Sequence, residues 1–173
     1  TFLEVFPDLH IAENVRGLLE MVGIEKISTN RDRSVIRVYI DSPRLMHKQS
    51  IYDLEKGIKE QLFPGKRVKI KILEKYHLSS QYTPEKLMNV YWDSILMELK
   101  NYSILLYNMF RKAEMDFEEE GYLKLSLEDT MIVRDKAPEL VRILEKIFTE
   151  RCNVPMVAKT SYRPVEKKNT EPE

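Results

Sequence analysis

The sequence predicts an α+β fold of two small domains, each a three-stranded sheet packed with helices. Two observations lead to this prediction. Segments with the 3.6-residue period of a helix alternate with short segments that have the two-residue period of a strand. The order helix, strand, strand, helix, strand in the first half returns in nearly the same form in the second. We expect domains at 1–76 and 77–165, followed by a polar linker tail at 166–173.

The first predicted elements are a helix over about 8–22 and a β-hairpin. Apolar residues recur at helical spacing up to Val22, and Gly23 is placed to end the helix. Two strands, 24–28 and 34–41, then flank a polar turn. In the second strand the residues that alternate toward one side are Ile36, Val38 and Ile40. This alternation is typical of a strand that is buried on one face only.

A second helix and a third strand complete the first half. The residues on the buried face of this helix are predicted to be Ile51, Leu54, Ile58 and Leu62. The helix should stop at Pro64 and Gly65. In the strand at 66–73, Val68, Ile70 and Ile72 are expected to point inward, while Arg67, Lys69 and Lys71 point outward.

The second half begins with a long helical segment. Thr83 can cap a helix that starts at Pro84 and keeps an apolar stripe to about residue 112, with a break near Asn101 as the alternative to one continuous helix. A hairpin at 113–129 follows. The stretch 126–148 reads as a short helical turn, a tight link and a longer amphipathic helix. The strand at 154–162 ends the unit.

This order resembles a type II KH domain, with residues 133–136 in place of its Gly-x-x-Gly loop. That loop depends on glycine, because only a residue without a side chain lets backbone N–H groups approach the phosphates of a nucleic acid. The residues found here are Val133, Arg134, Asp135 and Lys136. Both glycines are missing and Asp135 adds a negative charge. We therefore expect a KH-like scaffold whose degenerate loop does not bind nucleic acid.

The stretches "HLSSQYTPEKLMNVYWDSILMELKNYSILLYNMFRKAE" and "RILEKIFTERC" resemble the N-terminal region of the PolC-type DNA polymerase III α subunit of low-GC Gram-positive bacteria. The resemblance covers most of the chain and is strongest over about 70–165. It implies a non-catalytic fragment of a DNA-directed DNA polymerase with 3′–5′ exonuclease, with the rest of the polymerase chain following residue 173. It also implies that the first domain is similar to the polymerase-binding domain of the clamp-loader τ subunit.

Composition and motifs favour a soluble, non-enzymatic domain. Hydrophobic residues make up 43% of the 173 residues and charged residues 32%, which indicates a folded rather than a disordered chain. No apolar run approaches the roughly 20 residues that span a bilayer, so we expect a cytoplasmic protein without a membrane partner. Clustered carboxylates for two catalytic metal ions are missing, and His10, His47 and His77 are isolated in sequence. We expect no catalytic residue, cofactor or metal site. Cys152 should be a structural thiol.

Two surfaces are candidates for binding. The possible nucleic-acid face consists of Lys66, Arg67, Lys69, Lys71 and Arg37, extended by Arg31 and Arg33. The same residues could equally form the ordinary charged outer face of a sheet. The possible partner contact consists of Phe2, Leu3, Val5 and Phe6 in the apolar leader, and of Trp92.

Two functions follow from these features. The preferred hypothesis is a non-catalytic module that tethers a replicative polymerase to a replisome partner, with τ as the first candidate by resemblance. The alternative is an auxiliary module that binds single-stranded DNA weakly through the basic face and steadies the template. The first half carries a net charge of +3 and the second half −3. This difference predicts that the two halves do different work.

Overall fold

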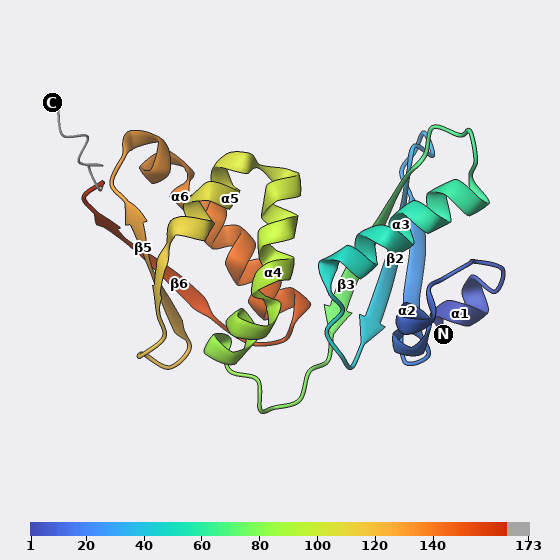
Figure 1. Ribbon diagram of the computed structural model, residues 1–173, viewed down its shortest axis with the longest axis horizontal. Helices are drawn as coiled ribbons and strands as arrows, with labels where there is room; N and C mark the ends of the chain where they lie inside the picture. Colours follow the sequence, from blue (N-terminus) through green and yellow to red (C-terminus); the bar gives the residue numbers. More distant parts are fainter. Residues whose placement is uncertain (166–173) are drawn as a thin grey trace, which may run out of the picture.

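The computed structural model describes residues 1–165 and confirms the predicted fold class. The chain is α+β, with two three-stranded sheets that are each packed with helices (Figure 1). The linker tail predicted at 166–173 lies outside the described residues.

The N-terminal half contains three helices and one sheet. Its elements are α1 (Phe2–Val5), α2 (Glu13–Leu19), β1 (Gly23–Thr29), β2 (Val35–Ser42), α3 (Lys48–Leu62) and β3 (Lys69–Tyr76). The sheet has the order β1-β2-β3. Strands β1 and β2 are antiparallel, as a hairpin requires, whereas β2 and β3 are parallel because α3 carries the chain back to the same edge.

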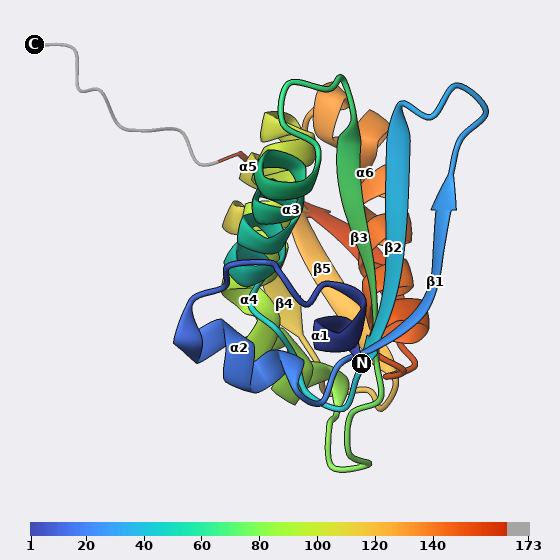
Figure 2. The same cartoon turned by 90° about the vertical axis from the view of Figure 1, so that its right-hand side faces the viewer.

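The alternation in the sequence decides which face of this sheet is buried. Val38, Ile40, Ile70 and Ile72 are buried on the side that α3 covers, and α3 contributes its own apolar stripe. Helices α2 and α3 lie on the same side of the sheet (Figures 1 and 2). The residues between these inward positions, such as Lys69 and Lys71, therefore face away from the helices.

The helix predicted over 8–22 is shorter in the structure. Helix α2 covers only Glu13–Leu19, and its N-cap residue, Ala12, offers no side-chain oxygen to the first backbone N–H groups. The apolar leader forms a helix of its own, α1, with a capping box between Thr1 and Glu4.

The C-terminal half repeats the sheet topology of the first. Its elements are α4 (Pro84–Tyr102), α5 (Ile104–Lys112), β4 (Glu114–Asp116), β5 (Tyr122–Glu128), α6 (Met131–Glu145), the π-helical turn η1 (Lys146–Arg151) and β6 (Val157–Arg163). The sheet order is β4-β5-β6, with an antiparallel pair followed by a parallel pair. The long helical segment does break, at Ser103, whose side chain caps α5.

The prediction of a link at 133–136 is wrong. Val133, Arg134, Asp135 and Lys136 lie within α6, which runs without interruption from Met131 to Glu145. The physical reason is the cap that starts this helix: the Thr130 hydroxyl accepts a hydrogen bond from the Val133 amide at 3.1 Å. The helix therefore begins before the expected link instead of after it. The KH-like arrangement, which depended on a loop at this place, is not confirmed.

The two halves share one core. Buried side chains of both halves form a continuous cluster that includes Ile51 of α3 and Ile95 of α4. Helix α3 packs against α4, and β3 contacts η1. The first sheet is thus attached to the second half at the end of β3 near Tyr76, and its other end projects away (Figure 1).

Candidate functional site

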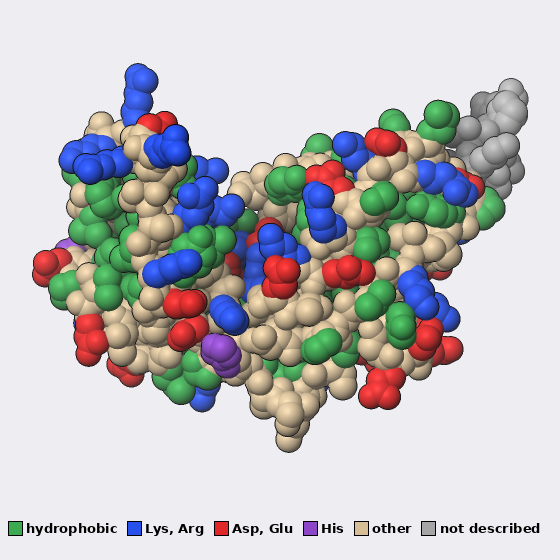
Figure 3. Space-filling model, turned by 180° about the vertical axis from the view of Figure 1, so that it is seen from behind, with side chains coloured by type: hydrophobic (Ala, Val, Ile, Leu, Met, Phe, Trp, Pro, Cys, Tyr) green, Lys and Arg blue, Asp and Glu red, His purple; other side chains and the backbone are tan. Residues whose placement is uncertain are grey.

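The predicted basic residues lie at one end and along one face of the first sheet. Lys69 and Lys71 are exposed on β3, and Arg37 of β2 pairs directly with Lys71 in the parallel ladder. Lys66 and Arg67 precede β3 in the loop that follows α3. The space-filling view from behind shows Lys and Arg side chains on this side of the N-terminal half (Figure 3). The structure therefore brings together basic residues from two separate segments.

The turn between β1 and β2 adds to the same end. The Lys69 amide donates to the Ser34 carbonyl at 2.8 Å, which holds this turn beside the start of β3. Arg31 and Arg33 belong to the turn, and Arg33 adopts a positive φ of 57°. Asp32 is the acidic residue there, and hydrogen bonds from Ser34 lower the pKa of its carboxyl group.

Sequence reasoning missed two residues of this face. Tyr39 lies on the central strand, between the inward residues Val38 and Ile40, and is half-buried. The Lys26 ammonium lies over the Tyr39 ring, 4.5 Å from its centroid. The signal was present, because Tyr39 occupies an outward position in the same alternation that identified Arg37.

The apolar leader only partly forms the exposed contact that was predicted. Phe2 is completely buried and packs against Phe6 at a ring-centroid distance of 5.0 Å, because α1 folds over the core. Phe2 therefore cannot be a surface contact. Leu3 and Phe6 are half-buried, and Val5 is 45% exposed. The leader leaves one of its apolar side chains clearly at the surface.

Other apolar residues are exposed near this helix. The Phe2 amide donates to the Val22 carbonyl at 2.8 Å, so α1 is held against the segment that follows α2. Leu18 is 36% exposed and Met21 56%. A hollow beside α2 is lined by Leu9, His10, Ile11, Ala12, Val15, Ser50, Asp53, Leu54 and Gly57. We call Val5, Leu18 and Met21 the α1/α2 surface.

Trp92 belongs to the second half and lies apart from the leader. It is half-buried on α4 and packs against Phe110 of α5, with ring centroids 4.6 Å apart. This contact joins α4 to α5. The ring therefore has a packing partner inside its own half of the molecule.

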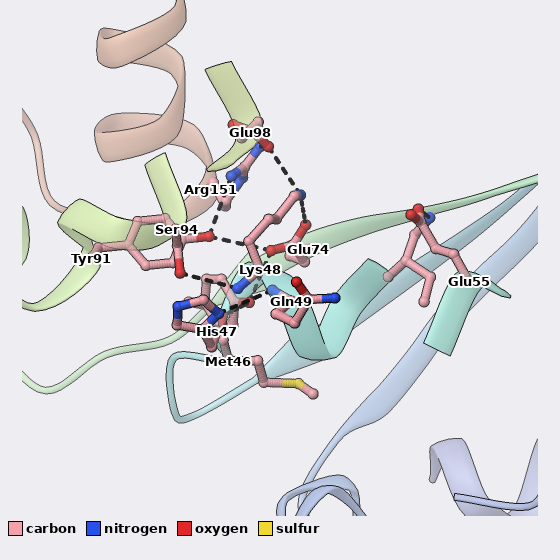
Figure 4. A network of polar contacts seen from close by, with 12 residues as sticks. Met46, His47, Lys48, Gln49, Glu55, Glu74, Tyr91, Ser94, Glu98 and Arg151 are labelled. Carbon is pink, nitrogen blue, oxygen red and sulfur yellow. Dashed lines mark hydrogen bonds and ion pairs between the residues drawn. The ribbon is translucent and has the colours of Figure 1, made fainter. Parts of the chain in front are cut away.

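A buried group of polar side chains joins the two halves (Figure 4). Lys48, at the start of α3, bonds to Glu74 of β3 at 2.6 Å and to Glu98 of α4 at 2.9 Å. Arg151 of η1 bonds to the same Glu98 oxygen at 2.8 Å. The side chains of Lys48 and Glu74 are 7% and 1% exposed. We call Lys48, Glu74, Glu98 and Arg151 the buried ion cluster.

Neutral hydrogen-bonding groups complete the buried ion cluster. The hydroxyls of Tyr76 and Tyr91 both donate to Glu74, at 3.0 and 3.3 Å. The Lys48 amide donates to the Ser94 hydroxyl at 3.0 Å, and the Asn153 side chain donates to the Tyr76 carbonyl at 2.7 Å. Every buried side-chain N or O atom in residues 1–165 has a hydrogen-bond partner. The cost of burying the charges is therefore offset by complete pairing.

The pKa values follow from this arrangement. Burial raises the pKa of Glu98, but the charges of Arg151 and Lys48 outweigh it and hold the value below the ordinary one. Burial lowers the pKa of Lys48, but the nearby carboxylates of Glu74 and Glu98 outweigh burial. The pKa of Lys48 is therefore raised above its ordinary value. Burial raises the pKa of the neighbouring Cys152 thiol to about 12, which leaves little reactive thiolate at neutral pH. Charged neighbours thus raise the pKa of Lys48 and of Arg151 and lower that of Glu98, so these three groups remain charged at pH 7.

The comparisons with known proteins bear on the N-terminal half. The family model of the DNA polymerase III polC-type N-terminus I matches residues 1–72. Residues 1–72 are therefore similar to the N-terminus of PolC-type polymerases. The family is the non-catalytic N-terminal region of a PolC-type replicative DNA polymerase. The search of curated proteins gave no match. The family match thus falls on the half in which the sequence resemblance was weaker.

The PolC N-terminus I segment contains most of the features described above. The matched range 1–72 includes the basic residues of the first sheet, the α1/α2 surface and Lys48 of the buried ion cluster. Glu74, a second member of the cluster, lies two residues after it. Glu98 and Arg151 come from the second half.

In residues 1–165, no three His, Cys, Asp or Glu side chains form a group that could hold a metal ion. No helix in that range is long and apolar enough to cross a membrane.

Proposed function

We propose that this chain is an interaction region that tethers a PolC-type replicative DNA polymerase to another protein of the replisome. The clamp-loader τ subunit is the first candidate partner, by the resemblance of the first half to the polymerase-binding domain of τ. The same resemblance puts the rest of the polymerase chain after residue 173. In this proposal the two halves are two domains of one cytoplasmic, non-catalytic connector.

The observation that carries the proposal is the α1/α2 surface on the PolC N-terminus I segment. Val5, Leu18 and Met21 are all at least one third exposed, and α1 and α2 are only four and seven residues long. Such short helices leave apolar side chains uncovered. Neighbouring exposed apolar groups of this kind usually mark a protein contact. The adjacent hollow beside α2 offers a place for an apolar side chain of the partner.

The buried ion cluster supports a tethering function in a second way. A connector transmits position only if its parts keep a fixed geometry. Lys48 and Glu98 belong to different halves and bond at 2.9 Å inside the protein, where solvent does not screen them. A partner that binds the α1/α2 surface would therefore also be held at a defined position relative to the second half.

Calorimetric titration of the intact 173-residue chain with τ tests the proposal. The double variant Val5→Glu and Met21→Glu places two charges on the α1/α2 surface, and we expect at least about tenfold weaker binding, equivalent to about 1.4 kcal/mol. The matched control is Met131→Glu, because Met131 is 89% exposed on α6 in the second half. It should leave τ binding unchanged. If Met131→Glu weakens binding and the double variant does not, the proposed contact is wrong.

A further inference from the structure

The face of the first sheet that points away from α3 has the side chains of a single-strand binding surface. We define the basic face as Lys26, Arg37, Tyr39, Lys69 and Lys71. Arg37, Tyr39, Lys69 and Lys71 alternate with the buried residues of β2 and β3, and Lys26 of β1 lies opposite Tyr39 in the ladder, so all five share one side of the sheet. We infer that the basic face binds single-stranded nucleic acid, by a contact that is separate from the α1/α2 surface.

The charge on this face is available to a ligand. Lys69 and Lys71 are exposed, and none of the four cations of the basic face makes an ion pair within residues 1–165. Asp41 is the carboxylate on the outward side of β2, two positions beyond Tyr39 and opposite Lys75 in the ladder. Cations in neighbouring strands, such as Arg37 beside Lys71, can contact successive phosphates of one extended strand.

Tyr39 provides the contact that a nucleic-acid base requires. It lies on the central strand with cations on both neighbouring strands, Lys26 on β1 and Lys71 on β3. Aromatic rings inside a positively charged groove bind single strands by stacking, without selecting a sequence. The Lys26 side chain now covers the ring. A base that stacks on Tyr39 takes the place of this flexible ammonium, which then pairs with a phosphate.

The second sheet has a similar pair of a cation and an aromatic ring, but we do not expect it to bind a single strand. On its corresponding face, the Lys159 ammonium lies 4.1 Å from the centroid of the Tyr122 ring. The same face carries acidic residues, however: Asp116 is opposite Lys124 in the ladder, and Glu119 lies 4.0 Å from the Lys124 ammonium. These carboxylates repel phosphate. Only the first sheet combines the aromatic ring with uncompensated positive charge.

Fluorescence anisotropy of a labelled oligo-dT strand, titrated with the intact chain at several salt concentrations, tests the inference. We expect salt-dependent binding. Lys69→Ala and Lys71→Ala should each weaken it and reduce the slope of log K against log salt by about 0.7, as expected for one lost phosphate contact. Tyr39→Ala should weaken binding about tenfold, whereas Tyr39→Phe, which keeps the ring, should bind like the wild type.

The second sheet provides the matched controls. Tyr122→Ala and Lys159→Ala alter the same kind of pair on the other sheet and should leave oligo-dT binding unchanged. The inference is overturned if oligo-dT does not bind, or if these controls weaken binding as much as the variants of the basic face. It is also overturned if poly-glutamate binds this face and oligo-dT does not, because the partner would then be an acidic protein. Unchanged τ binding by Lys69→Ala and Tyr39→Ala separates this inference from the proposed tethering function.

Discussion

Glu98 is the residue on which the connection between the halves depends most. One of its carboxylate oxygens accepts bonds from both Lys48 and Arg151, at 2.9 and 2.8 Å. Lys48 comes from the first half and Arg151 from the second. Without this carboxylate, Lys48 would keep its bond to Glu74, but Arg151 would lose its ion-pair partner. An uncompensated charge inside a protein is costly.

We expect Glu98→Ala to lower the free energy of unfolding by about 3 kcal/mol at pH 7, since breaking a buried ion pair from one side typically costs about 3–5 kcal/mol. Urea denaturation measures this change. The control is Glu60→Ala, which removes an exposed pair with Lys56 at 4.0 Å and should change the free energy by less than about 0.5 kcal/mol. Equal, small effects of both substitutions would contradict the role given to Glu98.

The same residue predicts a dependence on pH. Because the pKa of Glu98 is lower in the folded protein than its ordinary value of 4.5, the unfolded chain takes up the proton first as the pH falls. The contribution of Glu98 is therefore complete above about pH 4.5 and is lost as the pH falls through the folded-state pKa. Burial raises the pKa of Glu55, so Glu55 has the opposite effect on stability.

Comparison with Glu98→Gln isolates this effect from that of Glu55, which both proteins contain. We expect the difference in unfolding free energy between the wild type and Glu98→Gln to be largest at neutral pH and to shrink below about pH 4.5. Urea denaturation at a series of pH values measures it. A difference that stays constant down to pH 3 would show that ionised Glu98 does not stabilise the fold.

At the scale of elements, helix α6 continues through a proline. Pro138 lies inside this helix and lacks the N–H that would bond to the Arg134 carbonyl four residues earlier. A proline in the interior of a helix usually breaks or kinks it. Thr130 caps the helix, and Ala137, Leu140 and Leu144 bury one side of it. Together these contacts maintain the helix through the proline.

Replacement of Pro138 by alanine should therefore stabilise the protein. Alanine restores the donor to the Arg134 carbonyl, and the greater freedom of the unfolded chain offsets only part of the gain, about 0.4–1 kcal/mol. We expect a net increase of about 1 kcal/mol in the free energy of unfolding, measured with urea. Arg142→Ala, at an exposed position of the same helix, should change little. A loss of stability in Pro138→Ala would mean that the proline sets a helix geometry that the packing requires.

At the scale of the whole molecule, the buried ion cluster makes the two halves one folding unit. Lys48, Glu74 and Tyr76 of the first half have ion-pair or hydrogen-bond partners in the second. If the halves separated, these groups would lose their partners. A fragment that ends at residue 76 would carry the same defects, so point substitutions in the intact chain are the sharper test of the proposed contacts.

We expect the chain to unfold in one cooperative transition. Trp92 is the only tryptophan, and it reports on the second half through its contact with Phe110. Far-ultraviolet circular dichroism reports on both halves. The urea midpoints from Trp92 fluorescence and from circular dichroism should therefore coincide in the wild type and in the Glu60→Ala control. Two separate midpoints in the wild type would show that the halves unfold independently.

The sequence by itself determined the strands and the buried faces of both sheets. The alternation around Val38 and Ile70 predicted which side of the first sheet is buried, and it predicted that Lys69 and Lys71 point outward. Such patterns can be read locally because a residue's face within a strand depends only on its position in that strand. The similarity of the first half to the PolC-type N-terminus also followed from sequence.

Only the tertiary structure decided which distant residues meet. Lys48, Glu74, Glu98 and Arg151 come from four elements, and their individual sequence environments give no sign that they converge. Phe2 is buried because α1 folds over the core, and residues 133–136 are helical because the Thr130 cap and the buried side of α6 outweigh Pro138. The reason is the same in each case. Local periodicity reports how a segment faces its surroundings, whereas the packing of segments far apart in the chain decides what those surroundings are.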